Sequence, residues 1–427
     1  MKLLVQKSEL CGTAAIPGSK SHTIRAVAIA SLADGQSRIR CPLVSGDTLS
    51  AVHCYRTLGA QIDTSSNSEW LVHGTRGKIS NEHCRIDVGN SGTTLRLAMG
   101  SASLASKNSS IILDGDEQTR TRLVGALLQS LKDLGADGKC LKNNGYAPIE
   151  IRGTLQGGQT SIECFTSQFL SSLLLACPLA EGDSLIRVPL LNEPDYAKMT
   201  LDWLDRQGIC YKKTEMKEFF IPGGQKYSAF DAPIPADFSS ATFFLCAGAL
   251  IGKEITLTGL DFTDSQPDKA VVDYLTRMGA RIEHSSEGIT IFKSALRGID
   301  IDMNRTPDAL PAMAVTAAFA EGTTRFLNVP QARKKETDRI ACMAAELKKL
   351  GADVEELPDG LIVHGGRPLR STHLNGHGDH RIVMALSLAG MMLDGQTVID
   401  TAEAVNITFP TYASLMQSLG GHLTLLP

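Results

Sequence analysis

The sequence predicts an α/β protein built from six copies of one β-α-β-α-β-β unit, arranged as two domains of three copies each. First, the length of 427 residues exceeds the usual size of one hydrophobic core, which favours more than one domain. Second, apolar helix-like segments alternate with short β-rich runs. Third, the same order of segments recurs about every 70 residues along the whole chain.

Each copy opens with a polar turn, which is followed by an apolar helix rich in small residues. Serine, threonine and aspartate in such turns are typical of helix N-caps. We interpret Ser21, Ser91, Ser167 and Asp308 as caps of this kind, whether or not a ligand also binds there. The openings are residues 19–21, 90–92, 166–168, 238–240, 306–308 and 378–380.

A β-rich run follows each first helix, for example at residues 184–188 and 254–257. A second, amphipathic helix comes next and ends at a glycine, which suits the left-handed backbone of a C-cap. Between the third and fourth copies the Pro-rich segment 231–235 predicts a hinge between domains. The glycines that end the second helices are Gly59, Gly135, Gly208, Gly279, Gly351 and Gly420.

Composition and charge exclude several classes of protein. A net charge of -4 gives no overall basic surface, so nucleic acid is not an expected partner. The ten cysteines include no C-x-x-C pair, so we expect neither a zinc site nor a disulfide framework, but reduced thiols. The N-terminus turns polar at Gln6 and no later apolar run reaches membrane-spanning length. We therefore expect a cytoplasmic protein with no membrane partner.

Basic residues recur near the starts of the predicted helices. A cation there opposes the helix dipole, whereas backbone N–H groups at the same place favour anions. A single arginine in this position is usually a solvated surface charge, but recurrence in equivalent places favours an anion-binding site. The residues are Lys20, Arg25, Arg96, Arg120, Arg122, Arg333, Lys334, Lys335, Arg339 and Arg381.

Two carboxylates, Asp308 and Glu336, lie in opening turns among these cations. Nearby cations keep a carboxylate ionised at neutral pH, and a lysine crowded by other cations is easier to deprotonate. The combination supports proton transfer in both directions. His380, beside Arg381, is either a ligand-binding group or a buried core histidine.

Six motifs, in this order, carry a resemblance to a known family. They are Gly18-Ser19-Lys20-Ser21 with Arg25, Asn90-Ser91-Gly92-Thr93 with Arg96, Ser167-Gln168-Phe169-Leu170, Pro307-Asp308-Ala309, Lys335-Glu336-Thr337-Asp338-Arg339 and Gly378-Asp379-His380-Arg381. Over essentially its whole length the chain resembles the 5-enolpyruvylshikimate-3-phosphate synthases, a family of enolpyruvyl transferases. The resemblance implies a two-domain inside-out α/β barrel, with residues 1–17 plus 233–427 in one domain, residues 18–232 in the other and the active site in the cleft between them.

The resemblance also implies an activity in the shikimate pathway to chorismate and the aromatic amino acids. The enzyme would transfer the enolpyruvyl (1-carboxyvinyl) group of phosphoenolpyruvate to the 5-hydroxyl of shikimate 3-phosphate and release phosphate. It would act as a monomer, with no metal and no cofactor, and would be a target of glyphosate.

Site residues follow from the same resemblance. Asp308 would take the proton of the 5-hydroxyl, while either Glu336 or Lys20 would protonate the methylene of phosphoenolpyruvate. The residues implied to bind shikimate 3-phosphate are Lys20, Ser21, Arg25, Thr166, Ser167, Gln168, Tyr196, Asp308, Gln331 and Lys335. Those implied to bind phosphoenolpyruvate are Lys20, Gly92, Arg122, Gln168, Arg339, His380 and Arg381.

Some positions depart from the pattern of the family. Ile407 stands where a lysine is common, and Leu97 where a proline is common, so the response to glyphosate stays open. Thr166, Gln331 and Asn192 replace other residues but keep the ability to form hydrogen bonds.

Two alternative functions remain. One is the enolpyruvyl transferase that acts on UDP-N-acetylglucosamine, which typically opens with a Lys-Asn pair, whereas Ser21 follows Lys20 here. The other is an inactive binding relative, which the loss of Asp308, Glu336 or Lys20 would have signalled; all three are present.

Overall fold

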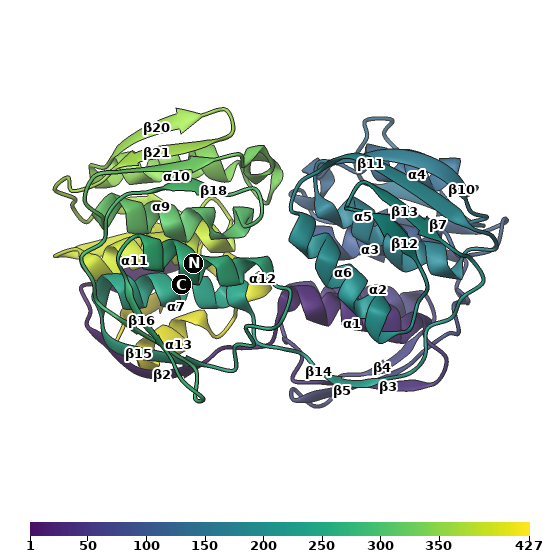
Figure 1. The fold of residues 1–427 in the computed structure, drawn as a ribbon, viewed down its shortest axis with the longest axis horizontal. Helices are drawn as coiled ribbons and strands as arrows, with labels where there is room; N and C mark the ends of the chain where they lie inside the picture. Colours follow the sequence, from purple (N-terminus) through teal and green to yellow (C-terminus); the bar gives the residue numbers. More distant parts are fainter. The chain divides into compact units, whose positions relative to one another are not determined.

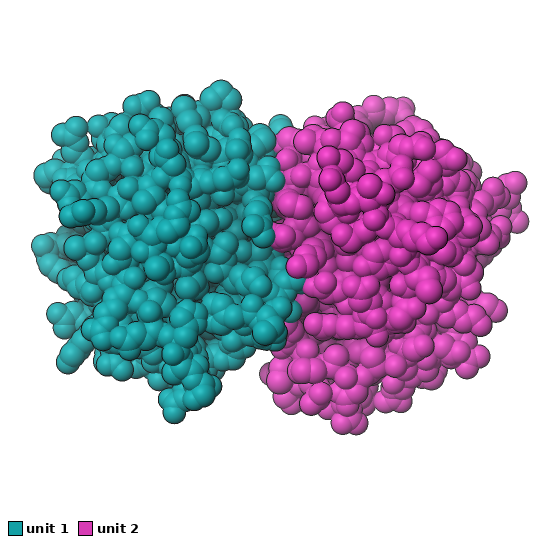
Figure 2. Space-filling model, in the orientation of Figure 1, with its two compact units in different colours: residues 1–17, 236–427 teal, residues 18–235 magenta.

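The computed structural model describes residues 1–427. The chain forms two compact units (Figures 1 and 2). Unit 1 contains residues 1–17 and 236–427, and unit 2 contains residues 18–235. Each unit has its own cluster of buried apolar side chains. The hydrophobic cores of the units are therefore separate.

Unit 2 contains three four-stranded sheets with one common topology (Figure 1). In each sheet one edge strand pairs in parallel with its neighbour, and the other two strands continue the sheet in antiparallel register. The first sheet has the order β14 (Asp231–Pro233), β3 (Gln36–Arg40), β5 (Glu69–His73) and β4 (Gln61–Asp63). The second has the order β6 (His83–Asp87), β7 (Ser110–Asp114), β9 (Ile149–Arg152) and β8 (Asp137–Cys140). The third has the order β10 (Gly158–Cys164), β11 (Ser184–Leu191), β13 (Glu218–Ile221) and β12 (Lys212–Thr214).

Unit 1 repeats the same topology three times. One sheet has the order β2 (Leu10–Ala15), β15 (Gly252–Thr258), β17 (Ile289–Phe292) and β16 (Arg281–His284). The next has the order β18 (Asp300–Asp302), β19 (Thr323–Leu327), β21 (Gly360–His364) and β20 (Asp353–Leu357). The last has the order β22 (His373–Asn375), β23 (Gln396–Asp400), β1 (Lys2–Gln6) and β24 (His422–Leu426), so the first strand of the chain completes the last sheet.

Two helices accompany each sheet. The first helices of the copies are α1 (Lys20–Leu32), α3 (Gly92–Ala102), α5 (Ser167–Ala176), α7 (Phe238–Ile251), α9 (Leu310–Phe319) and α11 (His380–Met392). The second helices are α2 (Gly46–Thr57), α4 (Gly125–Asp133), α6 (Pro194–Arg206), α8 (Ala270–Arg277), α10 (Arg339–Leu350) and α13 (Tyr412–Ser418), the last preceded by α12 (Val405–Thr408). Short 3₁₀ helices are η1 (Thr119–Thr121), η2 (Cys177–Leu179), η3 (Pro267–Lys269), η4 (Pro307–Ala309), η5 (Pro330–Lys334) and η6 (Ala402–Ala404).

The first helices form the centre of each unit. In unit 1, α7, α9 and α11 pack against one another, and every residue of α7 is buried. In unit 2, α3 packs against both α1 and α5. The sheets surround these helices, as Figure 1 shows for each unit by itself. Their apolar sequences suit this place, because a helix that is hydrophobic all round is buried on all sides. The predicted inside-out α/β fold of six repeated units is confirmed.

The predicted glycine C-caps of the second helices are confirmed, whereas the predicted N-caps of the first helices are partly wrong. All six glycines that were predicted to end the second helices have a positive φ, between 65° and 121°. Ser91 is the N-cap of α3, as predicted. However, Ser19 and Thr166 cap α1 and α5, whereas Ser21 and Ser167 lie inside the first turns of those helices. Asp308 lies in η4, before α9 begins.

Two further structural findings bear on function. No helix is long and apolar enough to span a bilayer. All ten cysteines are free thiols, and no group of three or more His, Cys, Asp or Glu side chains is arranged to hold a metal ion.

Candidate active site

In unit 1 the N-terminal ends of the three central helices meet. The guanidinium of Arg381, in the first turn of α11, donates a hydrogen bond of 2.8 Å to the Ser239 hydroxyl at the start of α7. The same group donates at 3.3 Å to the backbone carbonyl of Asp308, just before α9. Because helix N-termini carry unpaired N–H groups, this arrangement concentrates positive potential at one end of the unit.

Arg339 organises a cluster of three carboxylates at this end. Its side chain is only 1% exposed. One Nη donates to Asp308 at 2.7 Å and Nε donates to Asp379 at 2.8 Å, while the other Nη binds Glu336. Burial opposes the charge of Arg339, but the charges of Asp379, Glu336 and Asp308 raise its pKa above its ordinary value. One arginine therefore fixes both carboxylates that the sequence singled out.

Asp308 faces three cations. Besides Arg339, its carboxylate lies 3.3 Å from Arg381 and 3.7 Å from Lys335. Burial alone would raise the pKa of Asp308, but the charges of Arg381, Lys335 and Arg339 outweigh it and hold the pKa well below its ordinary value. The charge of Glu336, which binds the other Nη of Arg339, acts in the opposite direction and raises the pKa of Asp308. Asp308 is therefore ionised at neutral pH.

Sequence reasoning missed Asp379, the third carboxylate of this cluster. Asp379 is the N-cap of α11 and accepts a hydrogen bond of 2.9 Å from the Arg381 backbone N–H. The capping role explains an aspartate at this position without reference to a ligand. The only signal for a second role was its place beside His380 and Arg381. Ser239, which contacts Arg381, was likewise visible only as part of a helix opening.

Other predicted residues of unit 1 surround the cluster. The Gln331 amide donates at 2.9 Å to the Asn304 carbonyl, and its own oxygen Oε1 is buried without a hydrogen-bond partner. A donor bound there would satisfy that oxygen. His380 is buried, with Nδ1 at 3.8 Å from Asp379. Ile407 is half-buried in α12.

A second ion pair holds the loop that leads into α11. His377 Nε2 lies 2.8 Å from the buried Glu346 carboxylate of α10, which also binds Lys349 at 2.8 Å and the Asn375 backbone at 3.0 Å. Hydrogen bonds with Cys342 and with Glu346 raise the pKa of His377 to about 9. The loop that carries Asp379 is therefore tied to α10.

This pKa shift predicts a pH-dependent stability. A histidine whose pKa is higher in the folded chain stabilises the fold fully below its unfolded pKa of about 6.5. A rise of the pKa from 6.5 to about 9 corresponds to roughly 3 kcal/mol, and solvent screening of this half-buried side chain lowers it to on the order of 2 kcal/mol. This contribution is lost as the pH rises toward about 9. Urea unfolding of the unaltered protein should therefore show a stability advantage over His377→Gln at pH 6 that shrinks by pH 10. Stability curves that stay parallel across this range would contradict the ion pair.

In unit 2, Arg25 of α1 joins its own helix to α5, through a hydrogen bond of 3.4 Å to Ser171 Oγ, and to α6. Its guanidinium donates to Thr200 Oγ1 at 2.8 Å, to the Tyr196 carbonyl at 2.9 Å and to the Ser21 carbonyl at 3.0 Å. Burial lowers the pKa of Arg25 to about 10, so the side chain stays charged at neutral pH. It brings the start of α1 beside the start of α6, so that three of the predicted residues, Ser21, Arg25 and Tyr196, lie close together.

Two guanidinium groups converge on Gly92. A Cβ added at Gly92 would lie 3.6 Å from Arg122 Nη1 and 3.7 Å from Arg96 Nη1. Arg96 also donates at 2.6 Å to Gln168 Oε1, and the Gln168 amide donates at 3.0 Å to Thr93 Oγ1. These bonds place the starts of α3 and α5 side by side. The bare backbone of Gly92 therefore lies beside two cations at a helix N-terminus, an arrangement suited to an anion.

Thr166 and Ser167, at the start of α5, are already bound to a carboxylate. Glu193 Oε2 accepts from Ser167 Oγ at 3.1 Å and from Thr166 Oγ1 at 3.3 Å. The sequence had drawn attention to the neighbouring Asn192, whose amide instead donates at 3.2 Å to the Phe165 carbonyl. No local pattern pointed to Glu193, because its partners lie 26 and 27 residues away.

Lys20, at the start of α1, forms an ion pair of 3.0 Å with Asp47 of α2. Asp47 is mostly buried and was not identified from the sequence, since an acidic residue in a first helical turn needs no further explanation. Leu97, the other departure from the family pattern, is buried in α3.

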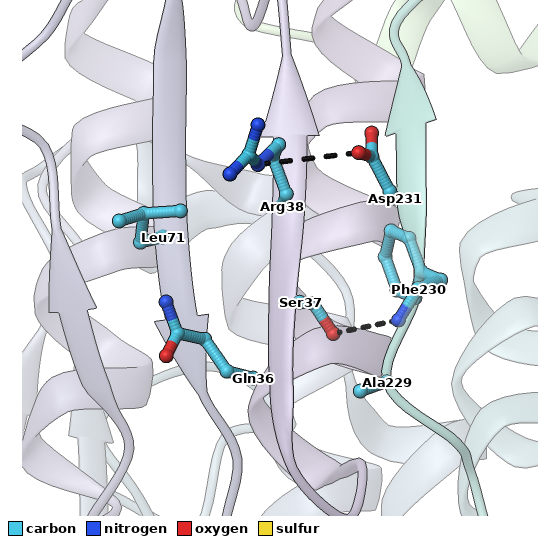
Figure 3. A pocket seen from close by; sticks show the side chains of 7 residues that line it. All are labelled: Gln36, Ser37, Arg38, Leu71, Ala229, Phe230 and Asp231. Atoms are coloured by element: carbon cyan, nitrogen blue, oxygen red, sulfur yellow. Dashed lines mark hydrogen bonds and ion pairs between the residues drawn. The ribbon is translucent and has the colours of Figure 1, made fainter.

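The structure thus brings the predicted residues together within each unit. Asp308, Lys335, Glu336, Arg339 and Arg381 form one cluster of charges in unit 1. A surface pocket of about 440 Å³ in unit 2 is separate from the predicted residues (Figure 3). It lies on the first sheet, where Arg38 is 3.9 Å from Asp231 and the Phe230 N–H donates to Ser37. None of its lining residues was predicted to bind substrate.

Comparison with known proteins gives consistent matches. A sequence model of the family described as EPSP synthase (3-phosphoshikimate 1-carboxyvinyltransferase) matches residues 4–416. A 3-phosphoshikimate 1-carboxyvinyltransferase of Ruminiclostridium cellulolyticum is 48% identical over 426 residues, which cover 100% of both chains. The enzyme of that name from Methanocaldococcus jannaschii is 41% identical, with 99% of each chain covered.

A solved structure agrees. The EPSP synthase from Acinetobacter baumannii matches with a TM-score of 0.83 and 26% sequence identity, and the match covers 100% of both chains. The resemblance inferred from the motifs is therefore confirmed over the whole length. The chain belongs to the EPSP synthase (3-phosphoshikimate 1-carboxyvinyltransferase) family.

Proposed function

We propose that the chain transfers the enolpyruvyl group of phosphoenolpyruvate to the 5-hydroxyl of shikimate 3-phosphate and releases phosphate. One observation supports the chemistry most strongly: Asp308 is a carboxylate held ionised among Arg339, Arg381 and Lys335. The two substrates carry two phosphates and two carboxylates, which bring about six negative charges. Six positive charges come from Lys20, Arg25, Arg122, Lys335, Arg339 and Arg381, at least four of which are paired with carboxylates before substrate binds.

Each unit contributes part of the proposed binding set. We assign Ser21, Arg25, Thr166, Ser167 and Tyr196 of unit 2 to shikimate 3-phosphate, together with Asp308, Gln331 and Lys335 of unit 1. Gly92 and Arg122 of unit 2, and Arg339, His380 and Arg381 of unit 1, are assigned to phosphoenolpyruvate. Lys20 and Gln168 contact both substrates in this proposal.

Substrate binding would make Asp308 a better base. With its pKa held far below neutral, Asp308 is a weak proton acceptor in the unliganded protein. When substrate anions pair with Arg381, Lys335 and Arg339, these cations attract Asp308 less, and its pKa rises toward the working pH. Asp308 then accepts the proton of the 5-hydroxyl as that oxygen bonds to C2 of phosphoenolpyruvate.

The methylene carbon of phosphoenolpyruvate gains a proton in the same addition step. Glu336, fixed by Arg339, and Lys20, paired with Asp47, are the two candidate donors. In the elimination step the methyl group loses a proton and the C2–O bond to phosphate breaks, which restores the double bond. The cations stabilise the negative charge of the departing phosphate.

A panel of acceptors tests this function. Purified protein with phosphoenolpyruvate should release phosphate when shikimate 3-phosphate is added, and not when shikimate or UDP-N-acetylglucosamine is added instead. Release with UDP-N-acetylglucosamine alone would favour the other transferase, and no release with any acceptor would favour an inactive relative. We also propose that the enzyme is a cytoplasmic monomer. Sedimentation of the purified protein tests the oligomeric state, and fractionation of the producing cells tests the location.

Gly92→Ala is expected to weaken phosphoenolpyruvate binding without unfolding the protein. The added methyl group would lie at ordinary contact distance, 3.6 Å or more, from the nearest atoms, so the fold accommodates it. It would, however, fill the space between Arg122 and Arg96 that we assign to an anion. We expect KM for phosphoenolpyruvate to rise about tenfold or more, a loss of about 1.4 kcal/mol of binding.

Gly125→Ala is the matched control. Gly125 is the first residue of α4, and the atom nearest to a Cβ added there, the Cα of Gly145, is 3.9 Å away. Steady-state kinetics of both variants provide the measurement. An unchanged KM for phosphoenolpyruvate in Gly92→Ala would remove Gly92 from the binding site.

A further inference from the structure

Glu193 places an acidic side chain inside the proposed site for shikimate 3-phosphate. It follows β11 and is the N-cap residue of α6, with a left-handed backbone conformation of φ 56° and ψ 48°. The residue is only 1% exposed. Its Oε2 accepts from the Ser167 hydroxyl at 3.1 Å, from the Thr166 hydroxyl at 3.3 Å and from the Ser167 N–H at 3.4 Å. A buried carboxylate therefore occupies the anion-binding end of α5.

Capping of its own helix does not account for this arrangement. The N-cap of α5 is Thr166, whose own side chain accepts from the Gln168 N–H. In its own helix, α6, the Glu193 side chain makes no capping hydrogen bond. The carboxylate thus reaches away from its own helix to a neighbouring one. Both hydroxyls that it binds belong to the set assigned to shikimate 3-phosphate.

The contacts are long for charged hydrogen bonds. Bonds to a carboxylate from a hydroxyl group usually measure about 2.5–2.7 Å, and those from a charged nitrogen about 2.7–2.9 Å. Both hydroxyl contacts of Glu193 exceed the first range. The contact from the neutral Ser167 N–H, at 3.4 Å, exceeds the usual length of about 2.7–3.2 Å for an N–H···O bond. A ligand with more acceptor oxygens and more charge would compete with the carboxylate for these donors.

We propose that Glu193 is an internal competitor for an anionic group of shikimate 3-phosphate, and that it sets the affinity of the enzyme for this substrate. This inference rests on the proposed function. Two anions cannot share the same pair of hydroxyls, because like charges in a buried site repel strongly. Shikimate 3-phosphate must therefore displace the Glu193 carboxylate when it binds, and this displacement weakens the observed affinity.

The position of Glu193 also connects it to other proposed ligand residues. Its backbone carbonyl accepts a hydrogen bond of 3.1 Å from the Tyr196 N–H, and the Tyr196 carbonyl accepts from Arg25. A left-handed backbone is uncommon for a glutamate and is retained only where surrounding contacts hold it. Displacement of the carboxylate removes three of these contacts. Glu193 therefore competes at the binding site and takes no part in the chemical step.

Glu193→Gln tests the competition. The amide has nearly the same shape as the carboxylate but no charge, so shikimate 3-phosphate meets less resistance. We expect calorimetry without phosphoenolpyruvate to show at least fivefold tighter binding of shikimate 3-phosphate, and KM for this substrate to fall equally. The values of kcat and of KM for phosphoenolpyruvate should stay within twofold. This split separates competition from a general structural effect, which would change all three constants.

Two further variants complete the test. Glu163→Gln removes the same charge from an exposed position of β10 in the same unit and should leave shikimate 3-phosphate binding unchanged. Glu193→Asp keeps the charge but shortens the side chain, and it should also tighten binding, since the carboxylate no longer reaches Ser167. If Glu193→Gln does not fold, the affinity of Glu193→Asp for shikimate 3-phosphate tests the proposal instead.

Unchanged or weaker binding of shikimate 3-phosphate by the folded Glu193 variants would overturn this inference and leave the proposed function intact. Equal tightening in Glu163→Gln would overturn it too, because net charge alone would then explain the effect. If the unaltered protein itself bound no shikimate 3-phosphate, the proposed function would fail and this inference with it.

Discussion

Replacing Asp308 by asparagine is expected to lower kcat for phosphate release by about 10³-fold or more. An amide has the size of the carboxylate but cannot accept the proton of the 5-hydroxyl. The change also leaves Arg339, Arg381 and Lys335 with one negative charge less, so the cluster attracts anionic substrates at least as strongly as before. KM for phosphoenolpyruvate should therefore not rise.

The control for this variant is Asp300→Asn, an exposed aspartate of β18 in the same unit, paired with Arg325 on the surface. It should retain full activity, because exposed ion pairs contribute little to structure. A kcat for Asp308→Asn within tenfold of the unaltered enzyme would show that another group is the base. A large rise in KM with little change in kcat would assign Asp308 to binding alone.

Arg339→Met is expected to destabilise unit 1 by about 3–5 kcal/mol, because it leaves Asp308, Glu336 and Asp379 close together without their shared cation. Activity should fall as well, since the position of Asp308 depends on this arginine. Both tryptophans, Trp70 and Trp203, lie in unit 2. Tryptophan fluorescence therefore reports unit 2, whereas circular dichroism reports both units.

During urea unfolding of Arg339→Met, we expect an early transition in circular dichroism that tryptophan fluorescence does not follow. The matched control is Arg325→Met, at an exposed arginine whose partner is Asp300, where the loss should stay below about 1 kcal/mol. If the two variants lost the same stability, the Arg339 cluster would not be a central element of unit 1.

Much of the fold could be predicted because its signals are local and repeated. The glycines that end the second helices need a positive φ, a requirement that a single position shows clearly. The N-caps could not be assigned with the same accuracy. Ser19 and Ser21 are both good caps and lie two residues apart, and only the structure distinguishes the cap from the first turn. Strand pairing was also beyond local reasoning, since β1 completes a sheet with β23 and β24 from the other end of the chain.

The candidate site was predictable where cations stood in unusual places. Arg339, Arg381 and Lys335 oppose helix dipoles, and the structure gives each of them a carboxylate partner. Asp379 and Glu193 were missed for different physical reasons. Capping fully explains an aspartate before α11, and the contacts of Glu193 connect segments far apart in sequence. A site residue that also caps a helix, or whose contacts connect distant segments, leaves no pattern of its own in the sequence.

The most direct test of the central claim follows the reaction by phosphorus NMR with stoichiometric substrates and no added metal. The account predicts that the signal of phosphoenolpyruvate falls while inorganic phosphate rises, and that the signal of shikimate 3-phosphate is converted in equal amount to that of a new phosphate monoester. Asp308→Asn should show no conversion on the same timescale. Release of phosphate while shikimate 3-phosphate stays unchanged would mean hydrolysis of phosphoenolpyruvate, and it would contradict enolpyruvyl transfer.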